Sequence, residues 1–198
     1  MNFALKKTNF KKSVTLEDWK NLPHDNDNKY DLISGELVLQ AAPSKEHSLI
    51  QGDLRSVLNC LRANKQNDGT FEKDKWIFAT EAGVIYGEDA CTHDLAGWKS
   101  DRLTSMSNET YFTLTPDWVC EIVSTNWKND TILKRNLLEE NKVPFYWMIT
   151  PHDSSIVVLE LLQNLYYHQL GIFRITDKAV SIPPFYEMEI DPRKIFNY

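Results

Sequence analysis

The spacing of apolar residues changes several times along the chain, and each spacing predicts a different element. Over residues 44–64, apolar side chains recur at intervals of three and four, the period of one helical face. These side chains are Leu49, Ile50, Leu54, Val57, Leu58 and Leu61. Ser44 can act as the N-cap, and Glu46 in the first turn suits the positive end of the helix dipole. The pattern predicts an amphipathic helix.

Short apolar runs between turn residues predict strands. Residues 30–40 contain two apolar runs around Ser34 and Gly35, which is typical of a tight hairpin because glycine supplies the positive φ of such turns. Further strands are predicted in eight apolar runs: 76–80, 82–86, 94–98, 118–123, 144–150, 154–162, 165–170 and 171–176.

A second helix is predicted between the strands at 118–123 and 144–150. Asn129 or Asp130 can cap it, and it is expected to end near Lys142. Its apolar stripe would consist of Ile132, Leu133, Leu137 and Leu138. A strand, a helix and a strand in this order imply a parallel pair joined by a right-handed crossover. We therefore predict an α/β fold in which helices flank a mixed β-sheet.

Length and composition indicate one ordinary domain, because 198 residues with 42% hydrophobic content can build a sizeable core. We divide the chain into an N-terminal arm with a short helix, residues 1–28, and a single domain, residues 29–198. Thr15 is the expected cap of the short helix. The lysines of the arm are more typical of a solvated segment than of a nucleic-acid contact. They are Lys6, Lys7, Lys11 and Lys12.

The net charge of −6 argues against a protein whose whole surface binds phosphate, although a local basic patch remains compatible with it. Cys60, Cys91 and Cys120 lack the spacing of a zinc site or a disulfide framework, which indicates reduced thiols. No signal-peptide pattern is visible, and no run approaches the roughly 20 apolar residues of a membrane span. We expect a cytoplasmic protein without a membrane partner.

Common nucleotide-binding and hydrolase motifs are absent from the sequence: there is no P-loop, no GxGxxG and no GxSxG. The five histidines never pair at i, i+4. A lone histidine is more often structural than a ligand. His47, near the start of the long helix, is the one that we retain as a candidate.

Glu121 interrupts the apolar run at 118–123, and a lone carboxylate is costly to bury without a partner. Asp94 opens the preceding long strand, and two carboxylates on neighbouring strands need a cation between them. Oxygen ligands of this kind suit Mg²⁺ or Mn²⁺, which can polarise a phosphate and activate water. A purely structural pairing of Glu121 with Lys134 or Arg135 is the alternative.

Lys134 lies at the border of the second helix's apolar stripe, so its ammonium could reach back over the sheet toward Glu121. A positive charge there would stabilise negative charge that develops on a phosphate, or orient the attacking water. Asp130 and Lys134 also form an ordinary i, i+4 pair, and most lysines on helices are solvated. Lys134 alone therefore does not decide between a catalytic and a structural role.

These segments together resemble the Uma family of restriction-endonuclease-like proteins, which have the PD-(D/E)XK nuclease fold. The resemblance covers about residues 29–170. It rests on five segments in the family's order: YDLISGELV, PSKEHSLIQGDL, HDLAGWKSDRL, PDWVCEIVS and NDTILKRNLLEENKVPFYWMIT. The resemblance implies a restriction-endonuclease-like mixed sheet flanked by helices.

The resemblance also implies roles for particular residues. Asp94 and Glu121 would be the metal ligands, with Glu46 and Glu81 as supporting acidic residues. Lys134 would replace the lysine that the wider fold places two residues after the glutamate, where this chain has Val123. Two further departures are His93, in place of the proline before the aspartate, and Thr125-Asn126, in place of a Pro-Ser pair.

The implied function is a metal-dependent DNA endonuclease that uses Mg²⁺ or Mn²⁺, and a nuclease that cuts both strands often works as a homodimer. The alternative is a binding or regulatory module that keeps the nuclease fold without activity, since a fold does not fix a function. The acidic net charge and the displaced lysine favour this module. The retention of Asp94, Glu121 and Lys134 favours the enzyme.

Overall fold

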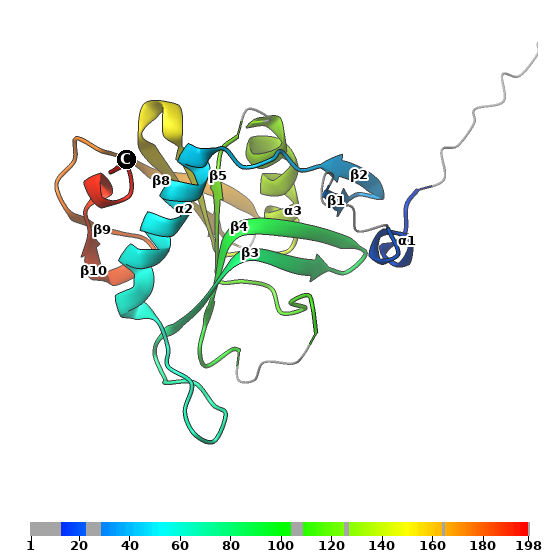
Figure 1. Ribbon diagram of the computed structural model, residues 1–198, viewed down its shortest axis with the longest axis horizontal. Helices are drawn as coiled ribbons and strands as arrows, with labels where there is room; N and C mark the ends of the chain where they lie inside the picture. Colours follow the sequence, from blue (N-terminus) through cyan, green and yellow to red (C-terminus); the bar gives the residue numbers. More distant parts are fainter. Residues whose placement is uncertain (1–12, 23–28, 104–108, 125–126, 164, 198) are drawn as a thin grey trace, which may run out of the picture.

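The computed structural model describes residues 13–22, 29–103, 109–124, 127–163 and 165–197. An eight-stranded mixed sheet forms its centre, and α2 crosses the sheet in the view of Figure 1. The strands of this sheet are β1 (Tyr30–Ile33), β2 (Glu36–Leu39), β3 (Trp76–Tyr86), β4 (Asp89–Lys99), β5 (Trp118–Ile122), β6 (Phe145–Thr150), β7 (Ser155–Leu162) and β8 (Tyr166–Arg174). The predicted α/β class with a mixed sheet flanked by helices is confirmed.

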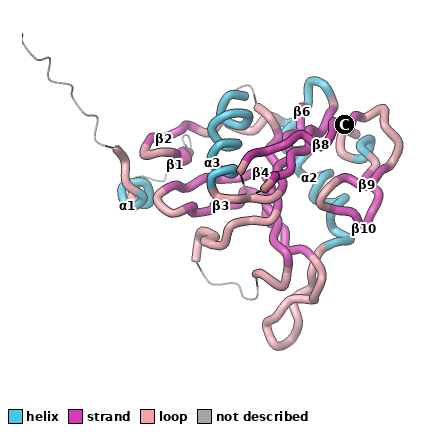
Figure 2. The backbone as a smooth tube through the Cα atoms, turned by 180° about the vertical axis from the view of Figure 1, so that it is seen from behind, coloured by secondary structure: helices cyan, strands magenta, loops and turns pink. Residues whose placement is uncertain are grey.

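The remaining described elements are helices and one separate hairpin. The α-helices are α1 (Leu16–Lys20), α2 (Lys45–Val57) and α3 (Arg135–Glu140). Single helical turns of other kinds span Leu58–Leu61, Asn129–Lys134, Pro151–Asp153 and Pro192–Lys194, and the second of these is a π-helix. A separate hairpin consists of β9 (Val180–Ile182) and β10 (Phe185–Ile190), and it lies near the chain's C-terminal end (Figure 2).

The strands follow the order β2-β1-β4-β5-β6-β7-β8, and β3 pairs with the other edge of β4. The β5–β6 pair is parallel, as predicted for the strands on either side of the second helix. The hairpin of β1 and β2 turns at Ser34 and Gly35, whose φ values of 53° and 74° match the predicted tight turn. Thr15 caps α1 through a reciprocal capping box with Asp18, which confirms the short N-terminal helix.

Two apolar cores lie on the two faces of the sheet. One core packs α2 against alternate residues of β5 such as Trp118 and Cys120. The other packs α3 against Val119, which points to the opposite face. The two helices therefore cover opposite faces, and the sheet between them carries few polar side chains.

Several predicted bounds were wrong. The runs at 76–80 and 82–86 form one strand, β3, and the runs at 165–170 and 171–176 form one strand, β8. β4 begins at Asp89, so Asp94 lies in the middle of its strand and not at its start. Paired strands in a long hairpin continue through a polar residue, because the ladder hydrogen bonds belong to the backbone.

The helix predicted from a cap at Asn129 or Asp130 to about Lys142 also differs in its phase. Trp127 and Lys128 are already helical, although the expected caps were Asn129 or Asp130. Ile132 and Leu133 are exposed, while Asp130 and Lys134 are buried. The π-helical turn shifts the phase of the side chains, and the buried carboxylate of Glu121 pairs with Lys134 on the inner face. In the first long helix, Leu49 is likewise exposed, whereas the other predicted positions face the sheet.

The three cysteines are free thiols, as expected. Among the described residues, no helix is long and apolar enough to cross a membrane. The lysines predicted to form a solvated arm lie outside the described residues.

Gly97 in β4 illustrates how tightly the aromatic core is packed. A Cβ at this position would lie 3.0 Å from the Phe78 ring and 3.2 Å from the Trp118 ring. We expect Gly97→Ala to lower the free energy of unfolding by about 1–3 kcal/mol, because the rings must shift. Urea denaturation measures the effect. Gly52→Ala is the control, since this exposed position in α2 has open space around it, and it is expected to stabilise slightly. Equal stability of Gly97→Ala and wild type would contradict the packing argument.

Candidate active site

The candidate site lies along one edge of β4, at the point where the neighbouring strand changes from β1 to β5. Along this edge, β4 pairs with β1 at Ala90 and with β5 from Leu95 onward. Between these two pairings, side chains and not a strand form hydrogen bonds with the backbone of β4. The Thr92 N–H donates to Asp31 Oδ1 at 2.8 Å, and the Thr92 carbonyl accepts from Lys134 Nζ at 3.0 Å. The split in the sheet thus brings charged side chains into a region that would otherwise be apolar.

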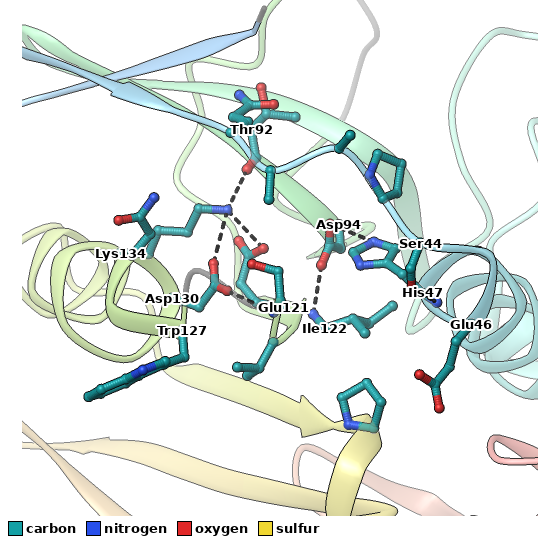
Figure 3. A pocket seen from close by; sticks show the side chains of 18 of the residues that line it. Ser44, Glu46, His47, Thr92, Asp94, Glu121, Ile122, Trp127, Asp130 and Lys134 are labelled. Atoms are coloured by element: carbon teal, nitrogen blue, oxygen red, sulfur yellow. Dashed lines mark hydrogen bonds and ion pairs between the residues drawn. The ribbon is translucent and has the colours of Figure 1, made fainter.

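A pocket of about 770 Å³ opens at this split (Figure 3). Helices from both faces of the sheet contribute to it: His47 comes from α2, and Lys134 from the π-helical turn. Six carboxyl side chains but only two lysines, Lys29 and Lys134, line it among the described residues. The acidic members are Asp31, Glu46, Glu81, Asp94, Glu121 and Asp130. Acidic side chains therefore outnumber lysines in the lining, and a bound cation would reduce their repulsion of a phosphate.

Glu121 is fully buried, and both of its oxygens are occupied. Oε2 accepts from Lys134 Nζ at 2.9 Å, and Oε1 lies 2.6 Å from His93 Nδ1. Burial raises the pKa of Glu121 well above its usual value, and the Lys134 ammonium opposes this shift. Burial lowers the pKa of Lys134, but the charge of Glu121 and its acidic neighbours outweighs burial and raises that pKa well above its usual range. Glu121 and Lys134 thus form a buried ion pair, in which the charge of each group favours the charged form of the other.

His93 fixes the orientation of the Glu121 carboxylate. Burial, together with the nearby Lys134 ammonium, lowers the pKa of His93 well below its usual value, so the imidazole is neutral. Its Nδ1–H then donates to Glu121, and its Nε2 accepts from the Tyr86 hydroxyl at 2.9 Å. His93 thus serves as a hydrogen-bonding support for the buried glutamate.

Asp94 lies beside this ion pair and is partly exposed to the pocket. Its Oδ2 accepts from the N–H of Ile122 at 2.6 Å, which anchors the carboxylate to β5 directly after Glu121. Its Oδ1 lies 3.2 Å from His47 Nε2. Figure 3 shows the two side chains pointing toward each other across the gap between α2 and the sheet. Asp94 is therefore rigidly held, with one oxygen directed at the pocket.

His47, Glu81 and Asp94 form a compact group in which the possible ligand atoms all lie within 4.8 Å of one another. Gln51 supports this group, because its Nε2 donates to Glu81 Oε1 at 2.9 Å and to the Asp94 carbonyl at 2.8 Å. His47 Nε2 is buried, and its 3.2 Å contact with Asp94 Oδ1 lacks the geometry of a hydrogen bond. One imidazole nitrogen and two carboxylates form a ligand set that fits a divalent cation.

The structure brings the predicted residues Asp94, Glu121 and Lys134 into one pocket, and His47 and Glu81 join them there. Glu46 also lines the pocket, but it is exposed and points away from the pair of His47 and Asp94 (Figure 3). Glu121 is not part of the compact ligand group found among the described residues.

Sequence reasoning missed three supporting residues. Asp31 interrupts the apolar strand β1 and is buried, which is the same signal that drew attention to Glu121. His93 was noted only as a departure from the family pattern. Gln51 lies among polar positions of α2 and carried no signal, because its role depends on how the helix docks on β3 and β4.

Comparison with known proteins gives the family context of this site. A family model, Uma2, described as "Putative restriction endonuclease", matches residues 16–192. The crystal structure of a putative nuclease belonging to DUF820 from Anabaena variabilis is similar, with a TM-score of 0.72 and 20% sequence identity. The match covers 93% of this chain and 98% of that chain, and at this identity it shows a shared fold. No curated protein matches the sequence.

Proposed function

Because the chain belongs to the Uma2 family, described as putative restriction endonucleases, we propose that it is a metal-dependent endonuclease that hydrolyses phosphodiester bonds in DNA. One observation carries the proposal: Asp94, Glu121 and Lys134, which are far apart in the sequence, converge on one pocket at the split of the sheet. Such convergence of carboxylates and a lysine in a concave site is typical of catalytic centres.

The charge of the pocket supports a requirement for a divalent cation. Its carboxylates would repel a DNA phosphate, and the two lysines cannot neutralise them. Asp94 presents one carboxylate oxygen to the pocket and is the first proposed ligand, with Glu121 as the second ligand that the nuclease-fold resemblance implies. A bound Mg²⁺ or Mn²⁺ would polarise a phosphate oxygen and lower the pKa of a bound water.

Lys134 is the proposed source of positive charge for the reacting phosphate. Its ammonium is held by the Thr92 carbonyl and Glu121 Oε2, so its position in the pocket wall is fixed before substrate binds. Glu121 keeps it protonated, and His93 in turn orients Glu121. A preorganised charge of this kind stabilises negative charge that develops in the transition state without further reorganisation.

Cleavage assays test the proposal directly. We expect the wild type to cleave supercoiled plasmid DNA in the presence of Mg²⁺ or Mn²⁺ and to lose this activity in EDTA. Glu121→Gln and Lys134→Ala, each confirmed as folded by circular dichroism, are expected to lose most of the activity. Lys128→Ala, an exposed lysine in the same helical segment, is the matched control and should cleave like wild type.

Two outcomes would overturn the proposal. The first is cleavage that both substitutions leave unchanged. The second is DNA binding without cleavage under any metal condition, which would favour the non-catalytic binding module.

Single-stranded DNA and RNA belong in the same assay, because the preference for DNA over RNA stays a prediction. The expected homodimer also stays a prediction. Sedimentation of the chain with and without DNA measures its oligomeric state.

A further inference from the structure

We infer that His47, Glu81 and Asp94 together hold the divalent ion of this pocket, and that the imidazole makes the site prefer Mn²⁺ to Mg²⁺. The inference rests on the proposed metal-dependent function and specifies its metal. It differs from the ligand pair of Asp94 and Glu121 that the fold resemblance implies, because it assigns two other residues to the same ion.

The spacing of the three side chains supports their joint role. The possible ligand atoms lie within 4.8 Å of one another. His47 Nε2 and Asp94 Oδ1 are 3.2 Å apart, close to the roughly 3 Å that separates adjacent ligands at about 2.1 Å from an octahedral ion.

The side chain of His47 contacts Asp94, a member of the same group. Its backbone N–H is bonded to the Ser44 side chain, which fixes this residue in the first turn of α2. Its Nε2 is buried and lies 3.2 Å from Asp94 Oδ1, in a contact that lacks the geometry of a hydrogen bond. A buried nitrogen without a well-aligned hydrogen bond is costly, and a metal ion bound between the two side chains would satisfy it.

Glu81 lies directly opposite Asp94 on the neighbouring strand. Thr80 pairs with Leu95, and Ala82 pairs with His93, so the register of the two strands does not shift between them. Glu81 and Asp94 are opposite each other in this register but are not bonded as a strand pair. Glu81 has a φ of 48°, which is uncommon for a residue other than glycine. Like charges directly opposite each other destabilise a sheet. The distorted backbone therefore holds two carboxylates together at a place where a cation would offset their repulsion.

Glu121 is less available as a ligand than these three residues. Both of its oxygens are hydrogen-bonded, one to His93 and one to Lys134, and its side chain is only 1% exposed. To bind an ion it would have to give up one of these hydrogen bonds. His47 and Glu81 already lie next to Asp94 and are less buried than Glu121, so they can bind an ion while the pair of Glu121 and Lys134 stays intact.

The nitrogen ligand determines the expected metal preference. Mg²⁺ prefers oxygen ligands and keeps several waters, whereas imidazole suits transition-metal ions. Among the two ions considered for nuclease activity, a site of one imidazole and two carboxylates favours Mn²⁺. Loss of the imidazole should therefore weaken Mn²⁺ binding much more than Mg²⁺ binding.

Calorimetric titration of the metal-free full chain with MnCl₂ and with MgCl₂ tests the inference without measuring activity. We expect Mn²⁺ to bind at least about tenfold more tightly than Mg²⁺. His47→Gln and Glu81→Gln should each weaken Mn²⁺ binding by about tenfold or more, and His47→Gln should remove the preference for Mn²⁺. His152→Gln is the matched control, because this exposed histidine lines the same pocket outside the ligand group.

Equal affinities for the two ions in the wild type would overturn the inference. So would Mn²⁺ binding that folded His47→Gln and Glu81→Gln variants retain in full. Thermal denaturation of each variant checks that it is folded. If Mn²⁺ binds with the expected pattern but DNA is not cleaved, the inference stands and the proposed nuclease function fails.

Discussion

Replacement of Lys134 by methionine is expected to lower the free energy of unfolding by about 3–5 kcal/mol, because it leaves the Glu121 carboxylate buried without its cationic partner. Methionine keeps most of the volume of the lysine stem, so the loss of charge is the main change. Urea denaturation monitored by tryptophan fluorescence measures the effect. The same substitution removes the proposed catalytic charge and should also abolish cleavage.

Two comparisons separate the buried charge from other effects. Lys128→Met, in an exposed position of the same helical segment, should change stability by less than about 0.5 kcal/mol. The double variant Lys134→Met/Glu121→Gln should recover part of the loss, since it removes the unpaired charge as well. A loss for Lys134→Met as small as that for Lys128→Met would mean that the pair does not stabilise Glu121.

The stability of the Lys134→Met variant should also depend on pH. Burial raises the pKa of Glu121, and Lys134 is the main group that opposes this shift. In the variant, the folded state therefore binds a proton that the unfolded state releases above the usual glutamate pKa. Stability then falls as pH rises above that value, so the variant should be less stable at neutral pH than under mildly acidic conditions.

Asp94→Asn is expected to reduce DNA cleavage by about 10³-fold, since the charge stabilisation that a metal ion supplies is worth several kcal/mol. Its stability should be unchanged or slightly higher. Asparagine can still accept the hydrogen bond from the Ile122 N–H, and the repulsion with Glu81 and Glu121 is removed. Single-turnover cleavage and urea denaturation on the same preparation measure both effects.

Glu88→Gln is the matched control for this substitution, because Glu88 lies in the exposed turn between β3 and β4. It removes one negative charge at a distance from the pocket and should leave cleavage unchanged. Equal loss of activity in Glu88→Gln and Asp94→Asn would point to a general effect of net charge on DNA binding. Loss of activity in Asp94→Asn that follows loss of folding would also contradict the assigned role.

The sequence was informative where a local pattern determined the structure. The turn at Ser34 and Gly35 and the N-caps at Thr15 and Ser44 are set by residues close together in the chain, and all three were predicted. The acidic residue in the apolar strand β5 correctly marked a buried charge. These features require no knowledge of how distant segments pack.

Features that depend on contacts between distant segments could not be predicted. The phase of the helix after Trp127 depends on a π-helical turn and on the pairing of Lys134 with Glu121, so Ile132 was wrongly expected to be buried. The group of His47, Glu81 and Asp94 depends on the register of β3 and β4 and on the docking of α2. The spacing of residues along the sequence predicts neither the phase of this helix nor the group of three ligand residues.

Metal-restored cleavage of plasmid DNA tests most directly whether this pocket is a metal-dependent nuclease centre. Wild type and Asp94→Asn would be treated with EDTA, freed of it and titrated with MnCl₂ while cleavage is followed. We predict no cleavage before the metal is added, a saturable return of activity in the wild type, and about 10³-fold less activity in Asp94→Asn. Cleavage that persists without metal, or that returns equally in both proteins, would contradict the account.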